Sequence, residues 1–148
     1  MTAARLHIAE PPQAYRMRPP LVVDCSVIAS TAFSESTQAE TDAQIAGREL
    51  FAPYLLQYEM ANVAWKKSRQ GLDALAAEAL EQFGAMAIRL FRIDEAEVVS
   101  LGLQYRITAY DASYLWLAAQ LKCPLATLDM QLAEASRRHL ANLGAPDA

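Results

Sequence analysis

Apolar and polar residues alternate in blocks along the chain, and these blocks predict strands that alternate with helices. Short apolar runs at Leu21–Val23 and Leu125–Leu128 are typical of buried parallel strands. Leu50–Ala52 and the alternating segment Ile88–Ile93 are two further strand candidates. Because helical spacing of apolar residues fills the intervals between these runs, the sequence predicts an α/β domain with a mainly parallel sheet.

The predicted helices are delimited by residues that favour helix ends. Pro53 suits a first helical turn, Gly71 suits the position just after a helix, and Asp73 and Asp94 are candidate caps. The polar segment Glu35–Glu40, rich in Ser and Thr, is expected to be a loop. Helices are therefore expected at Cys25–Phe33, around Asp42–Arg48, from Pro53 to Gly71, from Asp73 onward, at Asp94–Tyr105, from Thr108 to about Lys122, and from Asp129 to about His139.

The chain of 148 residues is long enough for one domain. Four prolines fall within residues 1–20, so this segment is expected to be an appendage to a domain that spans residues 21–140. Residues 141–148 are expected to be a tail, and they carry no clear pattern for a closing strand. We therefore expect one folded unit with short additions at both ends.

The composition limits the classes of protein and the cellular locations to be expected. Hydrophobic residues make up 53% and charged residues 20% of the chain, and no apolar run reaches the roughly 18 residues that a membrane span needs. With only Cys25 and Cys123 as thiols, a reduced, cytoplasmic location is expected. The net charge of −4 argues against a broad basic surface for nucleic acid. Lys66, Lys67 and Arg69 could contact phosphates, or could simply form a solvated helix end.

Two acidic residues follow predicted strands at equivalent places. Asp24 ends the first strand and Asp129 follows the last, and ligands of open parallel sheets bind at the carboxyl ends of strands. Two carboxylates at one edge repel each other unless a positive charge lies between them. A divalent cation would supply that charge, and oxygen ligands of this kind suit Mg²⁺ or Mn²⁺.

Two further acids could join this pair. Glu59 lies in a largely apolar helix with Asn62 three residues later, and Asp111 follows Thr108 at the spacing of a capping box. The simpler interpretation is that Glu59 lies on the surface and that the three aspartates cap helices. The sequence leaves both interpretations open, and they are compatible.

Other hydrolytic sites find little support. His7 and His139 lie near opposite ends of the chain, which makes a two-histidine ribonuclease site improbable. The sequence shows no evident Ser-His-Asp or Cys-His constellation and no glycine-rich phosphate loop. Cys25 is expected to be a small packed residue rather than a nucleophile. These exclusions favour the acidic residues as the chemical site.

Four segments together resemble the PIN domain family, in particular its bacterial toxin branch. The resemblance spans about residues 21–138 and implies an α/β/α sandwich with a parallel sheet of four or five strands. It also implies that Asp24, Glu59, Asp111 and Asp129 surround one or two Mg²⁺ or Mn²⁺ ions, with Ser26, Asn62 and Thr127 as polar neighbours. Members of this family cut RNA, are commonly inhibited by a small antitoxin protein, and often form homodimers. The segments are Val22-Val23-Asp24-Cys25-Ser26, Tyr58-Glu59-Met60-Ala61-Asn62, Thr108-Ala109-Tyr110-Asp111-Ala112-Ser113-Tyr114 and Thr127-Leu128-Asp129-Met130-Gln131-Leu132.

Two functions therefore compete. The first is a metal-dependent endoribonuclease, and the second is a catalytically inactive interaction module of the same fold, in which aromatic residues would form hot spots. A phosphoryl-transfer domain with Asp24 as nucleophile is a weaker third hypothesis, because no second acid lies beside it in the sequence. A homodimer is expected through the helix from Pro53 or the helix from Asp73. The aromatic candidates for an interface are Tyr54, Tyr58, Trp65, Tyr110, Tyr114 and Trp116.

Overall fold

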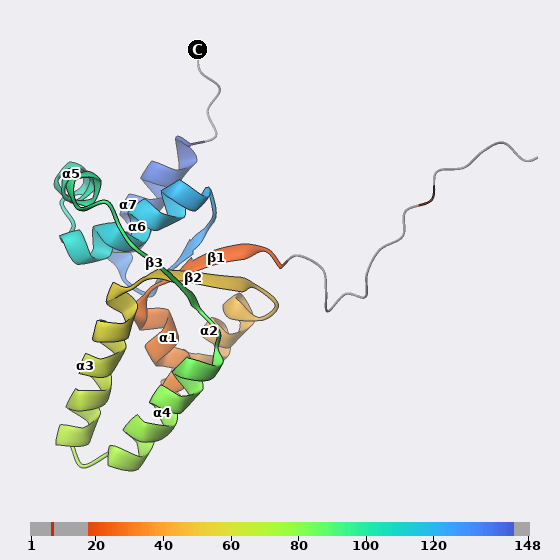
Figure 1. Cartoon of the computed structure of the whole chain (residues 1–148), viewed down its shortest axis with the longest axis vertical. Helices are drawn as coiled ribbons and strands as arrows, with labels where there is room; N and C mark the ends of the chain where they lie inside the picture. Colours follow the sequence, from red (N-terminus) through yellow and green to blue (C-terminus); the bar gives the residue numbers. More distant parts are fainter. Residues whose placement is uncertain (1–6, 8–17, 144–148) are drawn as a thin grey trace, which may run out of the picture.

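The computed structural model describes His7 and residues 18–143, and strands and helices follow one another along these residues (Figure 1). The predicted appendage 1–20 and tail 141–148 lie largely outside the described residues, so the division of the chain stays a prediction. The strands are β1 (Pro20–Val23), β2 (Glu49–Pro53), β3 (Arg89–Phe91) and β4 (Leu125–Ala126). The helices are α1 (Cys25–Ala32), α2 (Gln38–Ile45), α3 (Leu55–Arg69), α4 (Asp73–Ala85), α5 (Glu95–Tyr105), α6 (Ala109–Leu121) and α7 (Met130–Ala141).

The four strands form one parallel sheet in the order β3-β2-β1-β4. Helices α1 to α4 gather on one side of this sheet and α5 to α7 on the other (Figure 1). The predicted three-layer α/β/α architecture with a parallel sheet is therefore confirmed, with four strands within residues 18–143. The sheet order makes β1 an inner strand and leaves β4 at an edge.

The core lies where β1 meets the helices on both of its faces. Leu21, Val22 and Val23 are all buried, as expected for a parallel strand covered on both sides. In α6, Tyr114 and Leu115 are almost fully buried, and burying one large apolar side chain contributes about 1.5–3 kcal/mol. The packing of α6 against the sheet therefore fixes the start of this helix relative to the end of β1.

Pro53 corrects one sequence prediction, because it ends β2 instead of starting α3. The parallel register pairs Val22 with Phe51, which extends to place Pro53 opposite Asp24, where β1 has already ended. The Glu49 N–H donates to the Pro19 carbonyl, and the same alternation would direct an N–H at residue 53 to the Val23 carbonyl. Proline at this position therefore costs one hydrogen bond, at the last residue of the strand and not in its middle. On the other side, the Tyr54 N–H continues the ladder to the Phe91 carbonyl at 3.1 Å.

Two other helix starts differ from prediction. Asp73 is the first residue of α4, not its cap, and its carboxylate makes no capping hydrogen bond, although its charge still suits a helix N-terminus. The expected loop Glu35–Glu40 contains the first turn of α2, which ends at Ile45. Hydroxyl pairs tie α1 to this segment and explain the order there, with Ser30 bonded to Thr37 at 2.6 Å and Thr31 to Thr41 at 2.8 Å.

The ends of other elements agree with their predicted signals. Gly71 follows the last residues of α3 with a φ of 82°, the left-handed conformation that glycine favours after a helix. Asp94, Thr108 and Asp129 each cap the following helix through a side-chain oxygen. Within the described residues, no helix combines the length and apolarity required to cross a membrane.

Candidate active site

The topology brings the four predicted acids to one end of the sheet. Asp24 directly follows β1, and Asp129 follows the neighbouring strand β4 and caps α7. Asp111 lies in the first turn of α6, and Glu59 lies in the middle of α3. Because β1 and β4 are adjacent and parallel, their carboxyl ends point to the same edge, where such folds bind ligands.

Asp24 is buried, with only 5% of its surface exposed, and three donors hold its carboxylate. Ser26 Oγ donates to Oδ1 at 2.6 Å, and the Val27 N–H donates to the same atom at 3.2 Å as the cap of α1. Thr127 Oγ1, from the other side of the β1–β4 pair, donates to Oδ2 at 2.5 Å. Burial raises the pKa of Asp24, these hydrogen bonds oppose the rise, and the charge of Asp129 adds to it.

Glu59 is half-buried and held by Tyr114, whose hydroxyl donates to Oε1 at 2.5 Å. Burial raises the pKa of Glu59, this hydrogen bond lowers it, and the charges of Asp24 and Asp111 raise it further. The hydroxyl of Tyr114 has a strongly raised pKa, first because it is buried and then because it donates to Glu59. Tyr114 therefore acts as a fixed hydrogen-bond donor that orients one oxygen of Glu59.

Asp111 and Asp129 complete the group from two helix starts. The backbone N–H of Asp111 donates to Thr108 Oγ1 at 3.1 Å, while no described residue donates to its carboxylate. Burial raises the pKa of Asp111, and the charges of Asp129 and Asp24 raise it further. Asp129 is exposed, and its Oδ1 accepts from the Leu132 N–H at 2.8 Å.

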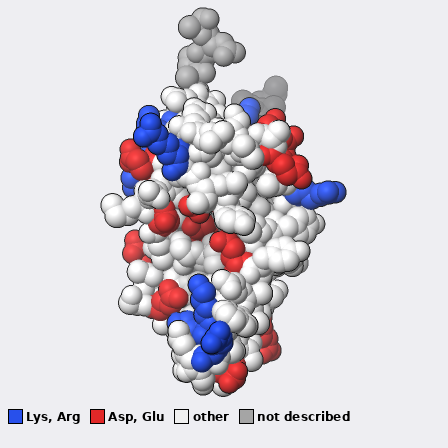
Figure 2. Space-filling model, turned by 90° about the vertical axis from the view of Figure 1, so that its left-hand side faces the viewer, with Lys and Arg blue, Asp and Glu red and all other residues white. Residues whose placement is uncertain are grey.

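The cap interpretation is confirmed for Asp24 and Asp129, and their positions remain compatible with the metal-ligand prediction. Each caps a helix, and each also lies close enough to the other acids to change their ionisation. Neither of the two ion pairs between described residues, Arg89 with Glu49 and Arg137 with Glu134, involves the four acids. Figure 2 shows acidic side chains in the middle of one face, with basic ones above and below them. The group therefore carries uncompensated negative charge.

The donor atoms of the four acids bear on whether a metal ion fits here. As the side chains stand, no three acidic, Cys or His groups among the described residues are arranged as a closed metal cage. The chemistry nevertheless fits a hard cation: the candidate donors are all carboxylate oxygens, and Asp111 has both oxygens free of described donors. A hydrated ion needs few protein ligands, because Mg²⁺ keeps several of its own waters.

Two of the three predicted polar neighbours contact the acids. Ser26 Oγ donates to Asp24 and accepts from the Leu128 N–H at 2.9 Å, so it links α1 to the segment after β4. Thr127 Oγ1 donates to Asp24 and accepts from the Asp129 N–H at 3.0 Å. Asn62 is exposed and bonds to none of the acids within the described part of the chain.

The predicted phosphate contacts lie farther away. Lys66, Lys67 and Arg69 lie in the last turns of α3, and Lys66 is seven positions after Glu59, which is roughly 10 Å along a helix. The Arg69 guanidinium lies over the ring of Trp65 at 5.1 Å. These cations therefore lie beyond direct contact with the acids, on the same helix as Glu59.

Tyr114 has a role that the sequence alone does not assign, and Cys25 has the one expected of it. Tyr114 had been considered for an interface, yet it is buried and holds Glu59, and its place one turn after Asp111 was the available signal. Cys25 is held as a protonated thiol, because burial and then the charges of Glu59, Asp24 and Glu35 raise its pKa to about 12. A thiol with this pKa is a poor nucleophile at neutral pH, in agreement with the sequence-based expectation.

Comparison with known proteins agrees with this geometry. A family model described as PIN domain matches residues 21–138. Ribonuclease VapC3 of Pyrobaculum aerophilum is 34% identical over 121 residues, which cover 77% of this chain and 92% of that protein. The crystal structure of PAE2754 from Pyrobaculum aerophilum superposes with a TM-score of 0.66 at 26% identity, and the match covers 86% of this chain and 97% of that one. The chain therefore belongs to the PIN domain family, in its VapC-like branch.

Proposed function

We propose that this protein is a divalent-metal-dependent endoribonuclease that hydrolyses RNA phosphodiester bonds at Asp24, Glu59, Asp111 and Asp129. The observation that carries the proposal is the position of these carboxylates at one sheet edge, without a basic partner among the described residues. Burial first, and the neighbouring acids second, raise the pKa values of Asp24, Glu59 and Asp111. Acids in such surroundings cluster at functional sites. The similarity to a protein named Ribonuclease VapC3 supports the same chemistry.

The residues that would hold Mg²⁺ or Mn²⁺ are the four carboxylates, with Asp24 and Asp111 as principal ligands. Glu59 and Asp129 would bind directly or through water. A bound divalent ion would stabilise the charge on the phosphodiester and ease deprotonation of an attacking water. The carboxylates are suited to this role because a bound cation would stabilise their ionised forms, which burial and then the neighbouring acids disfavour.

The surrounding residues position these ligands. Ser26 and Thr127 restrain the Asp24 carboxylate from opposite sides, and Tyr114 fixes one oxygen of Glu59. Such restraint matters because catalytic groups must be held in place by their neighbours before the substrate arrives. Lys66, Lys67 and Arg69 are proposed to attract the RNA backbone beyond the cleavage point, with a contribution that falls as salt rises.

The VapC name of the relative supports a further proposal, that this chain is the cytoplasmic toxin of a toxin–antitoxin pair held inactive by a small antitoxin. A homodimer is proposed through α3, where Tyr58 is 74% and Trp65 55% exposed. Large exposed aromatic side chains of this kind mark interfaces. Light scattering that finds only monomer at micromolar concentration would contradict the dimer.

The same exposed aromatics favour the second candidate, an inactive interaction module of the PIN fold. The two candidates differ in whether the acids bind metal. Calorimetric titration with Mn²⁺ should give heat that Asp24→Asn abolishes if the protein is the nuclease. An inactive module predicts no binding heat in either protein.

The decisive experiment compares Asp24→Asn with Asp94→Asn. Asn caps helices about as well as Asp, so the fold should survive in both variants. The cap bonds are equivalent, from the Val27 N–H to Asp24 at 3.2 Å and from the Glu97 N–H to Asp94 at 2.9 Å. We expect Asp24→Asn to lose Mn²⁺-dependent cleavage of single-stranded RNA by more than about 100-fold, beyond the usual cost of a residue that only supports a ligand. Asp94→Asn should retain full activity. Cleavage by Asp24→Asn at the native rate, or cleavage in excess chelator, would refute the proposal.

A further inference from the structure

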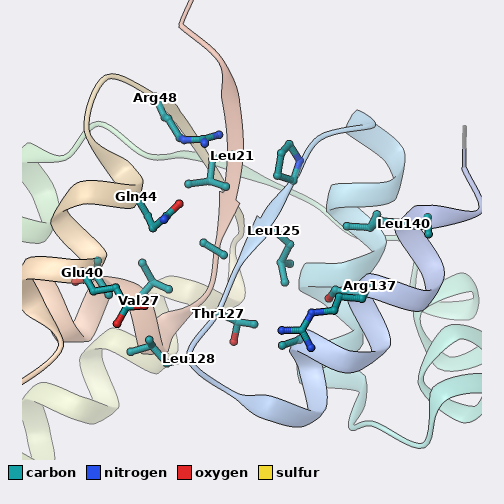
Figure 3. A pocket seen from close by; sticks show the side chains of 16 residues that line it. Leu21, Val27, Glu40, Gln44, Arg48, Leu125, Thr127, Leu128, Arg137 and Leu140 are labelled. Carbon is teal, nitrogen blue, oxygen red and sulfur yellow. The ribbon is translucent and has the colours of Figure 1, made fainter.

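A groove of about 700 Å³ runs along the open edge of the sheet, beside β4. We call it the β4-edge groove. Figure 3 shows Leu125 of β4 between two walls, with Glu40 and Gln44 on one side and Arg137 and Leu140 on the other. The walls belong to the α1–α2 layer and to α7. An open strand edge thus forms the floor of a channel between the two helical layers.

The floor carries backbone groups that have no partner among residues 18–143. The Val22 N–H donates to the Pro124 carbonyl at 2.9 Å, and the Asp24 N–H donates to the Ala126 carbonyl at 3.3 Å. Since bonding residues alternate along a parallel strand, the N–H and C=O groups of Leu125 and Thr127 point away from β1. Within residues 18–143 no strand lies beyond β4 to pair with them. Unpaired edges of this kind are templates for another strand.

The walls and rims indicate what the channel accepts. Its inner lining is largely apolar, with Leu21, Val27, Leu128 and Leu140 among the contributors, and the buried Ser136 Oγ beside it has no hydrogen-bond partner among the described atoms. Arg48 lies at one rim and forms no ion pair with a described residue. Arg137 lines the groove from α7 but pairs with Glu134 at 3.5 Å, and Glu40 is the one acid of the lining. The groove therefore combines apolar walls with one rim cation, Arg48, that has no described ion-pair partner.

These observations select one occupant. A second copy of this chain has its own β4 between the same helical layers, so two such recessed edges cannot approach each other. A single-stranded RNA would place charged phosphates against apolar walls and beside Glu40. An extended peptide meets every feature, because its backbone can pair with the edge while alternate side chains enter the walls. We propose that the β4-edge groove binds an extended segment of a partner protein as a fifth strand, with an acidic side chain of that segment facing Arg48.

The groove is linked to the acids through Thr127 but contains none of the four acids in its lining. Thr127 lines the groove, and its hydroxyl also donates to Asp24 Oδ2. A peptide that pairs with the Thr127 backbone would restrain the residue that holds Asp24. The inference concerns peptide binding, so it stands or falls independently of nuclease activity.

The test uses a phage-displayed library of random dodecapeptides, selected on the full-length chain. We expect selected peptides to alternate apolar residues and to carry an Asp or Glu. In synthetic copies of a selected peptide, N-methyl groups on one alternating set of residues should weaken binding at least tenfold, while the other set should have little effect. Arg48→Ala should weaken binding several-fold, and Arg89→Ala, at the opposite sheet edge, should not.

Hydrogen exchange locates the bound peptide. The amides of Leu125 and Thr127 should exchange freely in the full-length chain and become protected when peptide binds. Protection already present in the free chain would mean that its own terminal residues cover the edge, which would overturn the proposal. Equal binding by both N-methylated sets, failure to select any peptide, or protection of these amides by a single-stranded RNA pool instead would overturn it as well.

Discussion

The Tyr114–Glu59 hydrogen bond offers the sharpest test of how the site is held, through Tyr114→Phe. The substitution removes one hydroxyl from a buried ring and leaves its packing volume almost unchanged. A hydrogen bond to a charged group contributes about 1.5–3 kcal/mol when buried. Because Glu59 is only half-buried, water can replace part of the lost bond, so we expect the folded protein to lose about 1 kcal/mol.

The functional consequence follows from the direction of the pKa change. The Tyr114 hydroxyl lowers the pKa of Glu59, so its removal lets burial and the neighbouring charges of Asp24 and Asp111 raise that pKa further. Glu59 would then bind a proton at higher pH and lose its value as a ligand there. The acidic limb of the cleavage rate against pH should therefore move to higher pH.

The assay is Mn²⁺-dependent cleavage of a single-stranded RNA measured across pH, together with urea unfolding. Tyr105→Phe is the matched control. The Tyr105 hydroxyl forms a 3.0 Å hydrogen bond with His139 Nδ1, and this pair includes none of the four acids. It should lose about 1 kcal/mol of stability, the usual worth of a hydrogen bond, without moving the pH profile. If Tyr114→Phe destabilises the fold but leaves the acidic limb in place, Glu59 has no ionised role in cleavage.

The other predictions concern the acids as a group and the nearby thiol. Burial raises the pKa values of Asp24, Glu59 and Asp111 in the folded state, so the folded chain binds more protons than the unfolded chain, and the metal-free protein should gain stability as pH falls from neutral to about 5. Urea unfolding in the presence of chelator should show this gain. Mn²⁺ at neutral pH should stabilise the folded protein by mass action. A free energy of unfolding that rises with pH in chelator would contradict the link between carboxyl protonation and stability. Cys25, with its pKa raised to about 12, should resist iodoacetamide at neutral pH, and Cys25→Ala should cleave RNA normally. Rapid alkylation of Cys25 detected by mass spectrometry would contradict the raised pKa of this thiol.

The fold could be predicted where local chemistry and topology agree. Apolar runs that end in an acid identified β1 and the segment of β4, and the parallel arrangement then placed Asp24 and Asp129 at one edge. The prediction that Pro53 starts a helix was wrong, because proline is favoured in a first helical turn but is also tolerated at the end of a strand. The pairing of β2 with β3, which continues through Pro53, decides between these two, and no single sequence records that pairing.

The site was less predictable because its supporting contacts are long-range. Thr127 reaches Asp24 across 103 positions of sequence, and Tyr114 reaches Glu59 across 55. Such pairs depend on which helix packs over which strand, so the spacing of residues along the chain does not reveal them. Asn62 illustrates the opposite case, since its helical spacing from Glu59 is correct but it bonds to none of the acids in the described residues.

The carboxylates differ in how many of their lone pairs accept hydrogen bonds from described residues, and so in how many remain for a cation. An ionised carboxylate offers about four acceptor positions. Asp24 uses two on Oδ1, for Ser26 and Val27, and one on Oδ2, for Thr127, so it can offer one further position, on Oδ2. Asp111 has no described donor on its carboxylate and can offer all four. If the proposed cation binds, the buried Asp24 would therefore fix where it lies, and Asp111 would have the most capacity to hold it.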